Sequence, residues 1–106
     1  MFAIMIATLA LQAEPRVLTH VDFARPPMPE VPGAALSRGI PSGYATVECS
    51  VEAGAITACT IVDEDPAGIR FGVMLLSEMR RARLKPEIAA EVTRFRLTAR
   101  FVNRSL

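Results

Sequence analysis

The sequence is poor in the residues that build most catalytic and metal centres. It contains one histidine (His20), two cysteines, one tyrosine and no tryptophan. A structural zinc site needs several Cys or His ligands, which two cysteines and one distant histidine do not supply. The serines stand in no nucleophile motif, and no glycine-rich phosphate-binding loop occurs. We therefore expect no catalytic residues, no metal site, no cofactor and no enzymatic activity.

A strong excess of one charge is also lacking. Twelve basic and eleven acidic side chains give a net charge of +1, which argues against a dedicated nucleic-acid binder. The charge is unevenly placed: residues 1–69 carry three arginines and eight acids, or −5, and residues 70–106 carry nine basic groups and three acids, or +6. The basic half could meet anionic lipid, an acidic protein or phosphate, or it could complement the acidic half.

No apolar run is long enough for a transmembrane helix, which takes about 20 residues. Residues 1–13 (MFAIMIATLALQA) contain no charged side chain. This length suits the apolar region of a signal peptide, and Ala13 suits the position before a cleavage point. We expect export to the periplasm; the alternative is a cytoplasmic protein in which residues 1–13 join the core. Membrane contact is expected only if this segment is retained.

The rest of the chain divides into a proline-rich segment and one domain. Proline and glycine interrupt residues 14–43 too often for a long helix or a central strand. We expect this segment to run extended over the surface, with one short helical turn near residues 34–37. A single domain is expected over residues 44–106.

Residues 44–62 predict a β-hairpin. Apolar side chains occupy every second position from Ala45 to Val51, the period of a half-buried strand. Gly54 suits the turn, and residues 56–62 suit the partner strand. The acidic residues 63–65 and Pro66 are expected to end that strand.

A helix and a closing strand follow. Phe71, Leu75 and Met79 lie four residues apart and predict a helix over residues 69–84, which Pro86 would end. Basic side chains gather at its expected end, at Arg80, Arg81, Arg83 and Lys85. Residues 93–101 predict the last strand, because apolar and polar side chains alternate there. The fold class is therefore α+β: a small antiparallel sheet in strand-strand-helix-strand order with one helix packed on a face.

The two cysteines are equidistant from the expected turn. A hairpin centred on Gly54 places Cys49 opposite Cys59, with Cβ atoms roughly 4.5–5.5 Å apart. An exported protein would form a disulfide here; two free thiols and a metal site are the alternatives. The same register would pair Val47 with Ile61 and Val51 with Thr57.

The order and spacing of these elements resemble the TonB C-terminal domain family over residues 29–102. The motifs that carry the resemblance are Pro29-Glu30-Val31-Pro32 in place of a Tyr-Pro segment, Gly43 before the first strand, Gly54 in the turn, and the basic stretch 79–86. The resemblance implies a stand-alone periplasmic version of this domain. Twelve residues separate Ala13 from Pro26, a span of at most about 40 Å, so we expect binding rather than energy transduction.

The resemblance also implies where a partner binds. Family members pair their last strand with an extended segment of an outer-membrane receptor, and a second copy of the chain or another envelope protein could use the same edge. The expected edge-strand site is Arg94, Phe95, Arg96, Leu97, Thr98, Ala99 and Arg100. Its arginines either tune this edge or form an ordinary solvated face. The expected function is thus a protein-interaction module accessory to outer-membrane transport. The alternatives are an exported ligand-binding protein, a binder of anionic surfaces through the basic stretch, or an enzyme of unknown chemistry.

Overall fold

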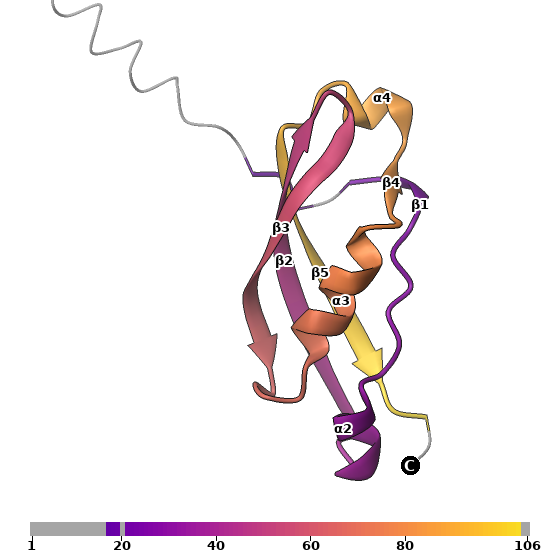
Figure 1. Cartoon of the computed structure of the whole chain (residues 1–106), viewed down its shortest axis with the longest axis vertical. Coiled ribbons are helices and arrows are strands. Elements are labelled where there is room, and N and C mark those ends of the chain that lie inside the picture. Colours follow the sequence, from indigo (N-terminus) through magenta and orange to yellow (C-terminus); the bar gives the residue numbers. More distant parts are fainter. Residues whose placement is uncertain (1–16, 20, 105–106) are drawn as a thin grey trace, which may run out of the picture.

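The computed structural model describes residues 17–19 and 21–104, which form a small α+β fold (Figure 1). Two antiparallel sheets and short helices make up the fold, which confirms the predicted class. No helix in this part of the chain is long and apolar enough to cross a membrane. The expected signal segment 1–13 lies outside the described residues. The elements are β1 (Phe23–Arg25), α2 (Gly33–Ser37), β2 (Ser42–Glu52), β3 (Ala55–Asp65), α3 (Phe71–Met79), β4 (Arg83–Leu84), α4 (Pro86–Ala89) and β5 (Arg94–Val102).

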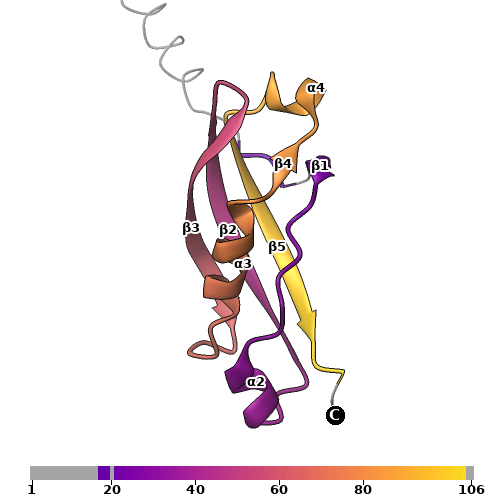
Figure 2. The same cartoon turned by 45° about the vertical axis from the view of Figure 1, so that its right-hand side comes forward.

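The main sheet has three strands in the order β3-β2-β5, with β2 in the centre. Helix α3 lies along one face of this sheet, against β2 and β3 (Figures 1 and 2). The strands β1 and β4 pair beside the end of α3 as a second, two-stranded sheet. The three-stranded sheet and its covering helix match the expectation, whereas β1, β4 and α4 were not predicted.

The core forms where the apolar faces of the sheet and the helix meet. Alternate residues of β2 from Ala45 to Val51 are buried, as the period of two predicted. From α3, Phe71 packs its ring 4.7 Å from that of Phe101 at the end of β5. Phe95 is fully buried and meets Phe23 edge to face. Each such aromatic side chain contributes about 1.5–3 kcal/mol by leaving water.

The helix is shorter than predicted because tertiary contacts recruit its expected last turn. α3 ends at Met79, whereas the prediction carried it to residue 84. Leu84 instead pairs with Phe23 and is buried, and Lys85 N donates to Asp22 O at 3.2 Å. Pro86 does not end α3; it occupies the first turn of α4, where a missing N–H costs nothing.

Strand β3 is longer than predicted and contains two bulges. Asp63, Glu64 and Asp65 pair with β2, so the expectation that these acids end the strand is wrong. Val47 pairs with Ile61 as predicted, but Val51 pairs with Ile56 rather than with Thr57. A bulge leaves one extra residue on one strand and so resets which side chains face the core.

Two features fix the lower end of the sheet in Figure 1. Strand β2 starts at Ser42, so Gly43 lies inside it and not before it; a Cβ there would lie 2.7 Å from Phe71 Cζ. The predicted helical turn near residues 34–37 is present as α2. The buried Asn103 side chain holds this turn to the end of β5, donating to Ile40 O at 3.1 Å and to Ala35 O at 3.4 Å.

Candidate functional site

The outer edge of β5 is the first candidate site, because β5 borders the sheet. In an antiparallel ladder, alternate residues direct both backbone groups to the same neighbour. Val51 N donates to Thr93 O at 2.9 Å, which sets the odd-numbered residues of β5 toward β2. The backbone groups of the even-numbered residues therefore point outward, at Arg94, Arg96, Thr98, Arg100 and Val102.

The first part of this edge is already occupied by the chain itself. Leu18 forms a parallel bridge opposite Phe95. Its carbonyl accepts from Arg96 N at 2.7 Å, and its N–H donates to Arg94 O at 3.4 Å. No described residue hydrogen-bonds to the outward backbone groups of Thr98, Arg100 or Val102. The structure thus divides the predicted site 94–100 into a covered part and an open part, and the open part reaches Val102.

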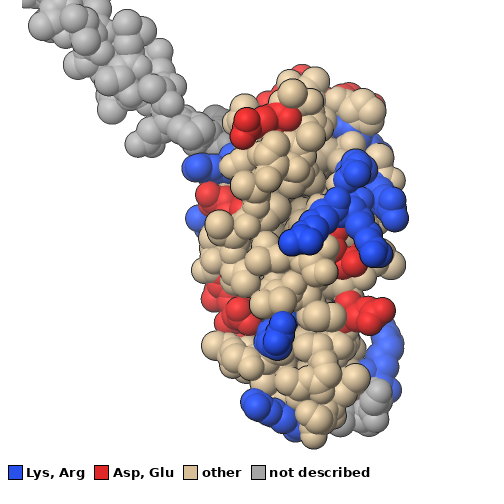
Figure 3. Space-filling view, viewed as in Figure 1, with Lys and Arg blue, Asp and Glu red and all other residues tan. Residues whose placement is uncertain are grey.

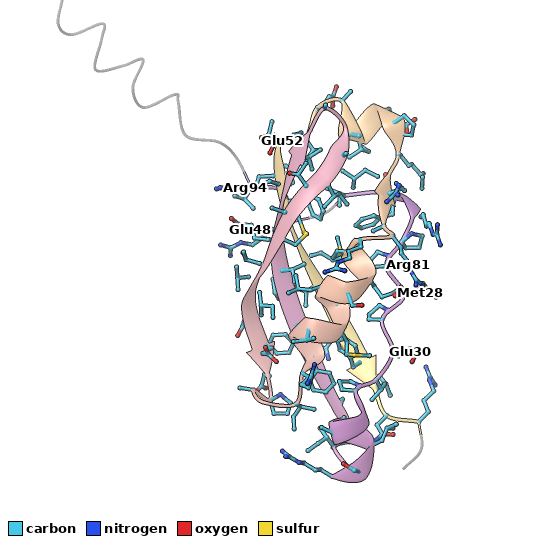
Figure 4. The ribbon with its side chains drawn as sticks, in the orientation of Figure 1. Met28, Glu30, Glu48, Glu52, Arg81 and Arg94 are labelled. Atoms are coloured by element: carbon cyan, nitrogen blue, oxygen red, sulfur yellow. A yellow bond between two sulfur atoms is a disulfide. The ribbon has the colours of Figure 1, made fainter. Side chains whose placement is uncertain are left out.

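The arginine side chains of the same strand lie on the face of the sheet opposite α3. Glu48 of β2 sits between two of them, with its carboxylate 3.5 Å from Arg94 Nε and 2.9 Å from Arg96 Nε (Figure 4). Next along the strands, the Thr46 and Thr98 hydroxyls lie 2.7 Å apart. Exposed ion pairs contribute about 0–1 kcal/mol each. Arg94 and Arg96 therefore belong to a solvated, cross-strand polar face, while Phe95 and Leu97 face the core as predicted.

Tyr44 adds a second polar link on this face. Its hydroxyl donates to the Asp63 carboxylate of β3 at 2.9 Å. This hydrogen bond, together with the negative charge of Asp63, raises the pKa of Tyr44 above its ordinary value of 10.0. The link holds the first residues of β2 to the last residues of β3, where the acids were expected to end the strand.

The predicted disulfide between Cys49 and Cys59 is confirmed. The two residues are register partners with Cα atoms 4.1 Å apart, and the structure therefore excludes the alternatives of free thiols and a metal site at this pair. Cys59 also borders a groove of about 460 Å³ between β3 and α3, which was not predicted. The β3 wall of the groove includes the residues at the bulge opposite Ser50 and Val51, and bulges leave little signal in a sequence.

The basic stretch gathers on one surface, at and beyond the end of α3. Arg80 and Arg81 follow α3, Arg83 lies in β4, and Lys85 precedes α4. Arg83 Nη1 donates to Arg80 O at 3.2 Å and to Ala82 O at 2.9 Å, which ties β4 to the end of the helix. Figure 3 shows lysine and arginine side chains massed over this region. Arg25, which no pattern in the sequence connected with this stretch, lies opposite Arg83 across β1 and β4.

Neither a search for metal-binding groups nor a comparison with known proteins indicates a further site. Within residues 17–19 and 21–104, no group of three His, Cys, Asp or Glu side chains is placed to hold a metal ion. No family model matches the chain, and no curated protein is significantly similar to it. The outer edge of β5 and the basic surface are therefore the two candidate sites.

Proposed function

We propose that this protein is a periplasmic TonB-like interaction module that binds an extended segment along the outer edge of β5. The observation that carries the proposal is the open backbone at Thr98, Arg100 and Val102, at the border of an antiparallel sheet. The sheet order β3-β2-β5, with α3 on one face, supports the resemblance to TonB C-terminal domains. The partner on this reading is a segment of an outer-membrane receptor, and a second copy of the chain is the alternative occupant.

The open edge offers enough hydrogen bonds for a modest affinity. Each outward residue presents one N–H and one C=O, and a backbone hydrogen bond contributes about 0.5–1.5 kcal/mol net. An extended segment that becomes ordered on binding loses about 2–5 kcal/mol of this gain. Three outward residues offer six such bonds, or about 3–9 kcal/mol before this loss, so the backbone alone supports millimolar or weaker binding over most of that range. Side chains on either side of the new strand must supply the remaining affinity and the specificity.

A proline at the open edge tests the proposal. Arg100→Pro removes an outward N–H but none of the bonds to β2, and edge strands tolerate proline. The matched control, Arg100→Gln, removes the same charge and keeps the N–H. Titrating synthetic receptor N-terminal segments into labelled protein should shift the amide resonances of residues 98–102 in the wild type and in Arg100→Gln, and not in Arg100→Pro.

The proposal fails if the shifts map away from β5 or if Arg100→Pro binds as well as Arg100→Gln. Unfolding curves of both variants must first show that the fold is kept. Leu97→Pro does not serve the purpose, because Leu97 pairs with Val47 and its N–H faces β2. Sedimentation of the protein without any added segment tests whether a second copy of the chain binds at this edge. A dimer that Arg100→Pro disrupts would place the second copy there.

A further inference from the structure

A second surface of the chain carries an excess of positive charge. We define the basic patch as Arg25, Arg80, Arg81 and Arg83. Three neighbouring elements supply it: β1, the segment after α3, and β4. Arg25 lies opposite Arg83 in the antiparallel pair, Arg83 donates to Arg80 O, and Arg25 and Arg81 line one open cavity. Figure 3 shows the resulting cluster over the end of α3.

No ion pair within the described residues neutralises this charge. Among the described residues, Arg94 and Arg96 pair with Glu48, whereas no arginine of the basic patch forms an ion pair. Like charges directly opposite each other across a strand pair are destabilising, yet Arg25 and Arg83 occupy such positions. An anion bound between these two arginines would offset their repulsion, because both guanidinium groups would be attracted to it.

Two carboxylates border the patch and limit what it can bind. Glu30 and Glu78 line the same cavity as Arg25 and Arg81 (Figure 4). An oxygen of Glu78 accepts a hydrogen bond from Met28 N at 3.3 Å, so that this carboxylate already has a partner within the chain. These acids disfavour a long polyanion that would cover the whole cavity. Arg80 and Arg83 do not line this cavity and can meet separate phosphates outside it.

The chemistry of the patch fits the surface of an anionic bilayer. The guanidinium groups match phosphate oxygens with two parallel hydrogen bonds each, and an open, multi-element surface meets several phosphates rather than enclosing one. Met28 borders the same cavity with 72% of its surface exposed, the highest value among the large apolar side chains of the described residues. Arg25 and Arg81 line this cavity beside Met28, together with Glu30 and Glu78. Exposed apolar side chains next to cationic ones are typical of proteins that lie on a membrane surface.

We propose that Arg25, Arg80, Arg81 and Arg83 dock the domain on anionic phospholipid headgroups, with Met28 entering the interface. This contact does not depend on residues 1–13, in contrast to the expectation from the sequence. It also leaves the outer edge of β5 available, because the patch lies beyond the end of α3 and on β1 and β4. The domain could thus hold a partner segment and a membrane surface together.

The test compares two variants of equal charge. Arg25→Gln/Arg80→Gln/Arg81→Gln removes patch charges and spares Arg83, whose side chain caps the helix end. The control, Arg38→Gln/Arg70→Gln/Arg104→Gln, removes exposed charges elsewhere. Both variants lower the net charge from +1 to −2 and keep residues 1–13. The probes are sedimenting vesicles of phosphatidylcholine alone and of phosphatidylcholine with phosphatidylglycerol, and unfolding curves check that both variants fold.

The expected result is selective loss of binding to the anionic vesicles. Each basic side chain near an anionic leaflet contributes about a factor of five to partitioning, so the patch variant should bind about 100-fold more weakly than the wild type. The control should lose much less, and added salt should weaken the wild type toward the level of the patch variant. Equal loss in both variants would overturn the proposal, as would equal binding to both kinds of vesicle. Release by inorganic phosphate at constant ionic strength would instead indicate a free-phosphate site, and preferential binding of RNA would indicate a nucleic-acid surface.

Discussion

The disulfide offers the sharpest test of how this small domain is held together. Cys49 and Cys59 join the central strand β2 to the edge strand β3, and Cys49 is 1% exposed. Two separate contributions to the free energy of unfolding depend on these cysteines. The disulfide restricts the conformations of the unfolded chain, and the sulfur atoms fill space in the core of the folded chain. Reduction breaks the disulfide and keeps the sulfur atoms, whereas mutation to alanine removes both, so comparing the two treatments separates the two contributions.

The first term follows from the length of the closed loop. The cysteines are 10 residues apart, for which the chain-entropy relation gives about 2.7 kcal/mol at 25 °C. The second term is about 1 kcal/mol for the buried Cys49 sulfur in Cys49→Ala/Cys59→Ala. For a domain of this size, the loop term corresponds to a fall in Tm of about 10–20 °C.

Guanidinium unfolding should be followed for three species: the oxidised wild type, the wild type in reductant, and the double alanine variant. Reductant should lower the free energy of unfolding of the wild type by about 2.7 kcal/mol and leave the variant unchanged. The variant should lie about 1 kcal/mol below the reduced wild type. If the oxidised and reduced wild type unfold within about 0.5 kcal/mol of each other, the loop argument is wrong.

Two further predictions concern Gly43 and Tyr44. Gly43→Ala should lower the free energy of unfolding by about 1–3 kcal/mol, because its Cβ would lie 2.7 Å from both Phe71 Cζ and the Asp65 carbonyl oxygen. Gly33→Ala is the control, since nothing lies within 4 Å of its Cβ; equal losses would refute the packing argument. Tyr44 is the only tyrosine, so its phenolate absorbance reports one group, with a midpoint above 10.0. Its raised folded pKa means that this stabilisation is present below pH 10.0 and is lost as the pH rises through the folded value. Asp63→Asn should return the midpoint toward 10.0; an unchanged midpoint would contradict the assigned cause.

Strict alternation made two of the strands predictable. In β2 from Ala45 to Val51 and in β5 from Arg94 to Phe101, the pattern of apolar and polar side chains follows burial, since each strand has one face on the core and one in water. The opposed cysteines were predicted from a hairpin centred on Gly54, but the turn alone does not set their register. Glu52 lies opposite Ala55, and the bulge between Ser50 and Val51 then brings Cys49 opposite Cys59. The pairing was therefore predicted correctly although the bulge that produces it was not.

The features that the sequence did not reveal depend on distant contacts. Residues 80–84 have good helix formers, but Leu84 is buried against β1, which lies far away in the sequence. The strand β1 has only three residues and no periodicity to detect. The prediction of the basic patch was incomplete for the same reason, because only the pairing of β1 with β4 brings Arg25 next to Arg83.

The outer edge of β5 is divided into a covered and an open part for two reasons. Only every second residue directs its backbone groups outward, and Leu18, far away in the sequence, bonds to the first of these residues. The sequence predicted residues 94–100 as one continuous site, and alternation then restricts the outward backbone groups to every second residue. Leu18 satisfies one backbone group of each of the first two residues, Arg94 O and Arg96 N, so a long partner strand would have to replace these two hydrogen bonds. Those exchanges contribute little net free energy, because each lost bond is matched by a new one. The affinity of any strand added to this edge should therefore depend on Thr98, Arg100 and Val102, at the end of β5 remote from Leu18.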